Sequence, residues 1–161
     1  MIETTEEPGL SALIKRGGGF SPVPGSNPQE LLTNLIRGLT LPRSVDAPTL
    51  LEAVLEREAL MPTAIGHGIA LPHPRNPLIS VPGEQFVTIA YTGQDLDWNA
   101  LDGKPVHTVI LMVSASAKLH LHTLSRINFF CHQESFRELL TNRVSRDDFI
   151  RAIEEAEQGW G

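Results

Sequence analysis

The fold is decided by one stretch of sequence, Val106-His-Thr-Val-Ile-Leu-Met-Val113. An almost unbroken apolar run of this length is typical of a central β-strand that is covered on both faces. Working outward, we predict a strand at 85–91 before it and a short apolar strand at 69–71. Apolar residues at helical spacing precede and follow these strands. The order of helices, strands and helices predicts a layered α/β fold in a single domain.

Residues typical of helix N-termini predict where the helices that flank the strands begin. The run Asn27-Pro28-Gln29-Glu30 predicts a first helix with Asn27 as its N-cap. A second helix is expected to begin near Asp46 or Pro48. Three more helices are predicted after the strands, at 116–131, around 136–140 and from 145 onward.

The beginning of the chain differs in composition from the rest. Gly17-Gly18-Gly19 stops any helical turn before it, and prolines at alternate positions limit 20–25 to an edge strand at best. We therefore expect residues 1–19 to be a lead-in segment that docks on the body or stays mobile. Residues 20–161 are expected to form the domain.

The charge and hydropathy of the chain exclude several classes of function. Its 161 residues include 13 Lys+Arg and 19 Asp+Glu, a formal net charge of −6. A nucleic-acid partner is not expected, because phosphate contacts need clustered cations. No apolar run approaches the roughly 20 residues of a membrane helix, and the first residues lack the pattern of a signal peptide. We expect a cytoplasmic protein without membrane insertion.

Chemistry is concentrated in Thr63-Ala-Ile-Gly-His-Gly-Ile-Ala-Leu-Pro-His-Pro-Arg75. The glycines at 66 and 68 allow a tight turn and leave backbone N–H groups open to an anion. Pro72 and Pro74 fix the backbone on either side of His73. A histidine held on so stiff a segment at the end of a strand is placed to react at its ring. The histidines at 67, 107, 122 and 132 are expected to be mostly structural or at the surface.

The residues around His73 closely resemble a known family signature. Glu56-Arg-Glu58 together with Thr63-Ala-Ile-Gly-His-Gly-Ile-Ala-Leu-Pro-His73 resembles the enzyme IIA domain of the mannitol/fructose type, from the bacterial phosphoenolpyruvate-dependent phosphotransferase system. The loop 97–106 and the helix start 120–125 resemble further parts of that family, which includes nitrogen-regulatory members. The resemblance spans about residues 20–153. It implies a central mixed β-sheet with helices on both faces.

The resemblance also implies the roles of individual residues. His73 would accept a phosphoryl group from a phosphorylated histidine phosphocarrier protein, with His120 hydrogen-bonding the phosphoryl oxygens and Arg57 as the nearby cation. A neutral imidazole has a nucleophilic lone pair at neutral pH, which suits this step. We further expect Thr63 and the Gly66–Gly68 backbone to add donors. No cofactor is implied, and the chain would be a component of phosphoryl transfer rather than a turnover enzyme on a small molecule.

Several alternatives stay open at this point. A regulatory, nitrogen-type role is favoured because the start at 17–25 resembles regulatory members, but a sugar-specific enzyme IIA that passes phosphoryl to a separate enzyme IIB would carry the same motif. A binding module that never takes phosphate, or a metal site at His67, His73, His120 and His122, belongs to a different class. Pro62 and Pro74 depart from the family pattern, which bears on the docking of a partner.

Overall fold

The computed structural model describes residues 9–159, which form a mixed β-sheet between two layers of helices. The five strands of the sheet lie in the order β1-β4-β5-β3-β2. Their bounds are β1 Gly19–Val23, β2 Ala64–Gly66, β3 Ile69–Ala70, β4 Phe86–Leu96 and β5 Val106–Val113. The pairs β1/β4 and β3/β5 are parallel, whereas β4/β5 and β2/β3 are antiparallel. The predicted central strand is confirmed, because β5 lies between β4 and β3.

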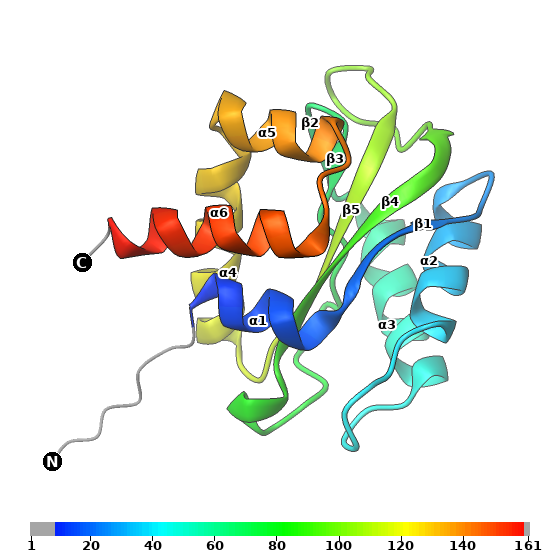
Figure 1. Cartoon of the computed structure of the whole chain (residues 1–161). Helices are drawn as coiled ribbons and strands as arrows, with labels where there is room; N and C mark the ends of the chain where they lie inside the picture. The colour runs from blue at the N-terminus through cyan, green and yellow to red at the C-terminus, as the bar shows by residue number, and fades with distance from the viewer. Residues whose placement is uncertain (1–8, 160–161) are drawn as a thin grey trace, which may run out of the picture.

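Helices cover both faces of the sheet, as predicted (Figure 1). One face carries α2 Pro28–Arg37 and α3 Ala47–Leu60. The other carries α1 Leu10–Gly17, α4 Ala117–Cys131, α5 Glu134–Thr141 and α6 Arg146–Gln158. A short 3-10 turn, Pro82–Glu84, precedes β4.

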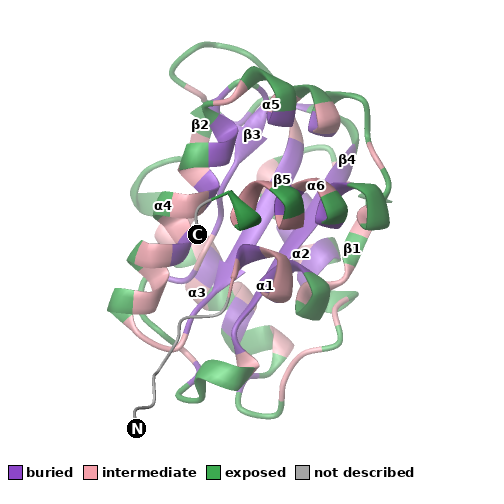
Figure 2. Cartoon of the chain, turned by 60° about the vertical axis from the view of Figure 1, so that its left-hand side comes forward, coloured by how far each residue is buried: buried purple, intermediate pink, exposed green. Residues whose placement is uncertain are grey.

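Alternate residues of β5 separate the two hydrophobic cores. Ile110 and Met112 face the helices α1, α4, α5 and α6, whereas Leu111 and Val113 face α2 and α3. Because side chains alternate across a strand, an unbroken apolar run supplies both cores at once. Figure 2 shows β4 and β5 coloured as buried between the helical layers.

The predicted helix starts coincide with side-chain caps in the structure. Asn27 Oδ1 accepts a hydrogen bond from the Glu30 backbone N–H at 2.8 Å. The corresponding bond from Thr49 N–H to Asp46 Oδ1 is also 2.8 Å long. Ser116 and Ser145 cap α4 and α6 in the same manner. Each cap satisfies one of the N–H groups that the first turn of a helix leaves without a partner.

The beginning of the chain forms a helix that packs on the sheet. Residues 10–17 form α1, in which Leu10, Leu13 and Ile14 are buried in the core at 3%, 3% and 1% exposure. The part of the lead-in that the structure describes thus docks on the body, one of the two outcomes expected for it, and the domain boundary at residue 19 stays a prediction; residues 1–8 lie outside the described residues. A helix this short is marginal on its own, and packing over β4 stabilises it.

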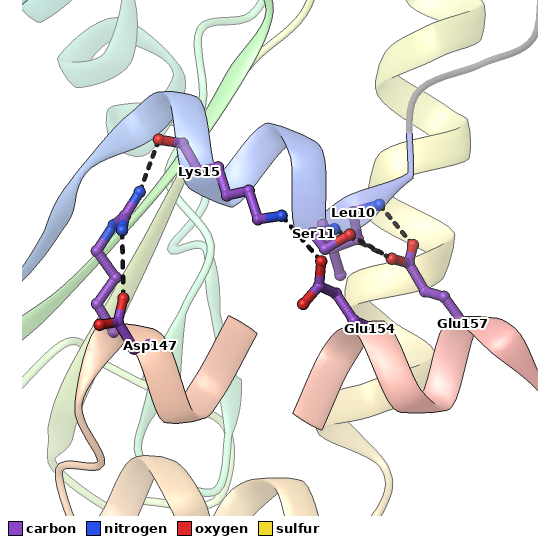
Figure 3. A network of polar contacts seen from close by, with 7 residues as sticks. Leu10, Ser11, Lys15, Asp147, Glu154 and Glu157 are labelled. Atoms are coloured by element: carbon purple, nitrogen blue, oxygen red, sulfur yellow. Dashed lines mark hydrogen bonds and ion pairs between the residues drawn. The ribbon is translucent and has the colours of Figure 1, made fainter. Parts of the chain in front are cut away.

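The side chain of Glu157 on α6 holds the N-terminus of α1 (Figure 3). Its carboxylate accepts hydrogen bonds from Leu10 N–H at 2.6 Å and from Ser11 N–H and Oγ at 3.2 and 2.7 Å. Arg126 donates to the same carboxylate at 3.2 Å. Since Gly9 makes no side-chain cap for α1, Glu157 satisfies these helix donors from the far end of the sequence.

Candidate functional site

His73 lies on a rigid segment that follows β3. The backbone N–H of Met112 on β5 donates to Pro72 O at 3.1 Å, and that of Leu71 donates to Thr63 O at 3.0 Å. These bonds continue the sheet up to the residue before His73, and Pro72 and Pro74 restrict the backbone on either side. The sequence thus fixes the place from which the imidazole projects.

The hydrogen bond of the His73 ring defines which nitrogen can react. His73 Nδ1 lies 2.8 Å from Leu71 O. A carbonyl oxygen can only accept, so Nδ1 carries the proton in this bond. In the neutral ring the lone pair is then on Nε2. The geometry assigns Nε2 as the nucleophilic atom.

His120, in the first turns of α4, lies directly beside His73. The centroids of the two rings are 4.6 Å apart, with 44° between the ring planes. Burial, the neighbouring His73 and the Arg57 charge lower the pKa of His120 to about 4. The pKa of His73 is also lowered, mainly by burial and further by Arg57, while the bond to Leu71 and the charge of Glu58 act in the opposite direction. Both imidazoles are therefore neutral at pH 7.

Arg57, in the last turn of α3, supplies a positive charge that acts on this pair of rings. Its Nη1 donates to Met61 O at 2.8 Å, which anchors one arm of the guanidinium. Its charge acts on both imidazoles. A guanidinium has five N–H donors in a planar fork, and an anion on His73 would meet a fixed positive charge here. The structure thus brings His73 and His120 together, and the charge of Arg57, from a third part of the chain, acts on both.

Thr63 donates its hydrogen bonds to Glu58 and not into the space beside His73. Its backbone N–H and its Oγ1 both donate to the carboxylate of Glu58, at 2.8 and 2.7 Å. Both donors of Thr63 are thus already used, and the residue is only 6% exposed. The expectation that Thr63 donates to a phosphoryl group is not supported by this geometry. Sequence reasoning gave Glu58 no role, although it directly follows Arg57 in the signature.

Gly66 and Gly68 lie away from His73. Residues 64–70 form the β2/β3 hairpin, in which β3 is the strand predicted at 69–71, whereas β2 is not predicted from the sequence. Both loop residues have positive φ, +58° at His67 and +81° at Gly68, as in a type I′ turn. Gly68 O accepts a hydrogen bond from the backbone N–H of His107 at the beginning of β5. Pro72, the residue before His73, lies four residues further on, which is about 13 Å in an extended chain. These glycines serve the turn, and the phosphoryl support expected from them stays a prediction.

His67 and His107 have partners of their own outside the pair. His67 occupies the hairpin turn, and its backbone N–H donates to Asp102 Oδ2 at 2.8 Å. The ring of His107 packs against Gly68, and its Nδ1 lies 2.7 Å from Thr108 Oγ1. Within residues 9–159, no three His, Cys, Asp or Glu side chains gather in a metal-binding arrangement.

An open cavity of about 240 Å³ adjoins the histidine pair. It lies between the segment after His73 and the beginning of α4, and its lining includes Arg75, Ser114, His120 and Leu121. Leu121 is 61% exposed at its edge, and Met61 beside the Arg57 anchor is 65% exposed. The histidine pair can thus be approached from outside over a partly apolar surface. No helix within the described part of the chain has the length and apolar character to cross a membrane.

Comparison with known proteins extends this description. The family model described as "Phosphoenolpyruvate-dependent sugar phosphotransferase system, EIIA 2" matches residues 21–156. The nitrogen regulatory protein of Pseudomonas aeruginosa is 27% identical over 154 residues, which cover 93% of this chain and 97% of that protein. The fructose-specific EIIABC component of Bacillus subtilis is 33% identical over 104 residues, 63% of this chain but only 16% of that protein. The crystal structure of nitrogen regulatory protein IIA-Ntr from Neisseria meningitidis superposes with a TM-score of 0.70 at 26% identity, covering 83% of this chain and 92% of that one.

Proposed function

The chain belongs to the EIIA 2 family of the phosphoenolpyruvate-dependent sugar phosphotransferase system, and on that premise we propose that it is a phosphohistidine carrier. His73 Nε2 takes the phosphoryl group from the phosphorylated histidine of a phosphocarrier protein. The observation that carries this proposal is the hydrogen bond from His73 Nδ1 to Leu71 O, which leaves the Nε2 lone pair free beside a second neutral histidine.

The transfer exchanges one phosphorus–nitrogen bond for another. The bond between phosphorus and the donor histidine breaks, and the bond between phosphorus and His73 Nε2 forms. The donor ring, protonated on its other nitrogen, takes the electron pair and leaves as a neutral imidazole. The phosphorylated ring keeps its Nδ1 proton, and Leu71 O stabilises the positive charge that this ring then carries. Catalysis of this kind depends mainly on positioning and on stabilisation of charge, and no general base has to remove a proton.

His120 and Arg57 stabilise the phosphoryl group. A neutral His120 has one ring N–H, which can be donated to a phosphoryl oxygen. Arg57 supplies the positive charge, and its anchor on Met61 O keeps that charge in place before the phosphoryl group arrives. Pro74 and Arg75 line the adjoining cavity, where a partner would approach.

A regulatory, nitrogen-type role is the more strongly supported version. The relative from P. aeruginosa is a nitrogen regulatory protein of almost the same extent as this chain. In this version the phosphorylation state of His73 is read by a regulated protein partner, in the cytoplasm. The second candidate is a sugar-specific enzyme IIA that delivers phosphoryl to enzyme IIB. It is favoured by the higher identity, 33%, to the fructose-specific protein of B. subtilis.

A phosphotransfer assay tests the proposal. The protein is incubated with phosphoenolpyruvate, enzyme I and a histidine phosphocarrier protein, and acid-labile phosphate on the chain is measured. Wild type and the control His132→Ala, which changes an exposed histidine at the end of α4, should be labelled, and His73→Ala should not. An unlabelled wild type would support a binding module instead. Addition of purified enzyme IIB then separates the two versions, because only a sugar-specific enzyme IIA should lose its label to it.

A further inference from the structure

The carboxylate of Glu58 joins three separate parts of the chain beside the histidine pair. It lies in the last turn of α3 and accepts hydrogen bonds from Thr63 N–H at 2.8 Å and Thr63 Oγ1 at 2.7 Å. A third bond, 2.9 Å long, comes from the indole N–H of Trp98 in the loop between β4 and β5. One side chain thus connects α3, the entry to β2 and the 97–105 loop.

The side chains that donate to Glu58 are buried, so water cannot take the place of the carboxylate. Trp98 is 2% exposed and Thr63 is 6% exposed. Loss of the acceptor would leave an indole N–H, an amide N–H and a hydroxyl without a partner away from water. Hydrogen bonds to a charged acceptor are also stronger and shorter than those between neutral groups. The last turn of α3 is therefore held in one orientation.

That orientation determines where Arg57 lies. Arg57 and Glu58 are consecutive residues at the end of α3, and both close the helix onto the segment that follows. Arg57 donates to Met61 O, whereas Glu58 accepts from Thr63. If the turn rotated, the guanidinium would move relative to the histidine pair.

From this geometry we propose that Glu58 is a positioning residue for phosphoryl transfer. It fixes Arg57 at the histidine pair through its bonds to Thr63 and Trp98, and its negative charge balances that of Arg57 at the ring of His73. The inference rests on the proposed function of His73, and it adds a residue that does not itself touch the phosphoryl group.

The charge of Glu58 gives the proposal a signature that does not depend on phosphoryl transfer. Arg57 lowers the pKa of His73 and Glu58 raises it. Neutralising Glu58 without changing its shape should lower the pKa of His73 further. A purely structural role, exercised through hydrogen bonds alone, would leave that pKa unchanged.

The test compares four variants with wild type, after circular dichroism has shown that each is folded. Glu58→Gln removes the charge, and Glu58→Asp keeps it. Thr63→Val removes one hydrogen bond but no charge. Glu52→Gln removes an exposed carboxylate from the same helix and serves as the control. The pKa of His73 is measured by NMR titration of its ring protons, and the rate of phosphoryl acceptance is measured over a range of donor concentrations.

We expect Glu58→Gln to lower the pKa of His73 and to slow the maximal rate about ten-fold, with little change in the donor concentration at half-maximal rate. Glu58→Asp should restore the pKa, and Thr63→Val and Glu52→Gln should not move it. An unchanged His73 pKa or an unchanged maximal rate in Glu58→Gln would overturn the proposal. If wild type takes no phosphoryl group, the proposed function fails. The titration still decides whether the charge of Glu58 acts on His73.

Discussion

Acidification should destabilise this protein through His120, and the size of the effect can be worked from the structure. The pKa of His120 is lowered to about 4 by burial, by His73 and by Arg57. In the unfolded chain a histidine titrates near pH 6.5. The folded state therefore binds fewer protons than the unfolded state between these values. Stability is fully present above about pH 6.5 and is lost as the pH falls toward 4.

At pH 5 the unfolded chain is nearly fully protonated at this residue and the folded chain hardly at all. Proton linkage then gives a loss of about 2 kcal/mol relative to pH 7.5. Because the ring is only partly buried, solvent screening reduces the expected loss to about 1 kcal/mol. His73, whose pKa is also lowered, should add to the same acid sensitivity.

The assay is urea denaturation at pH 7.5 and at pH 5.0, on wild type and on His120→Asn. All other titrating groups are present in both proteins. The difference between the two proteins in how their free energy of unfolding changes with pH is therefore the contribution of His120. The variant should lose about 1 kcal/mol less stability than wild type on acidification. Equal losses in the two proteins would refute the argument that a neutral His120 is held in the folded state.

Three further predictions concern stability. Glu157→Ala removes the carboxylate that holds the N-terminus of α1 and pairs with Arg126, and thermal unfolding should show a loss of about 2 kcal/mol. His67→Gly relieves a positive φ of 58° and should raise stability in urea by about 0.5–1 kcal/mol, since left-handed backbone is costly for other residues; a loss would contradict the turn assignment. Gly17→Ala would place a Cβ 1.9 Å from Val87 O, so we expect a loss of more than about 2 kcal/mol, and wild-type stability would show that α1 does not pack as closely as described.

The sequence predicts the elements whose signals are local. The caps at Asn27 and Asp46 and the apolar run of β5 each determine an element from adjacent residues, and all are present in the structure. The N-terminus of α1 is held by Glu157, which is distant in sequence. No local signal predicts such a contact.

The same distinction applies to the site. The signature identifies His73, and the resemblance implies the roles of His120 and Arg57. Residue type alone points to Thr63 and the glycines, because a hydroxyl or a backbone N–H near a histidine in sequence can donate a hydrogen bond to an anion. Only the fold shows that Glu58 occupies the donors of Thr63 and that the glycines belong to a hairpin turn.

The central claim is that His73 accepts phosphoryl on Nε2, because its Nδ1 proton is held by Leu71 O. The most direct test is NMR on protein with ¹⁵N-labelled histidine, phosphorylated by the phosphocarrier system and recorded with ³¹P coupling. We predict that phosphorus couples to Nε2 of His73 and that Nδ1 keeps its proton. Coupling to Nδ1, or to a nitrogen of His120, would contradict the account.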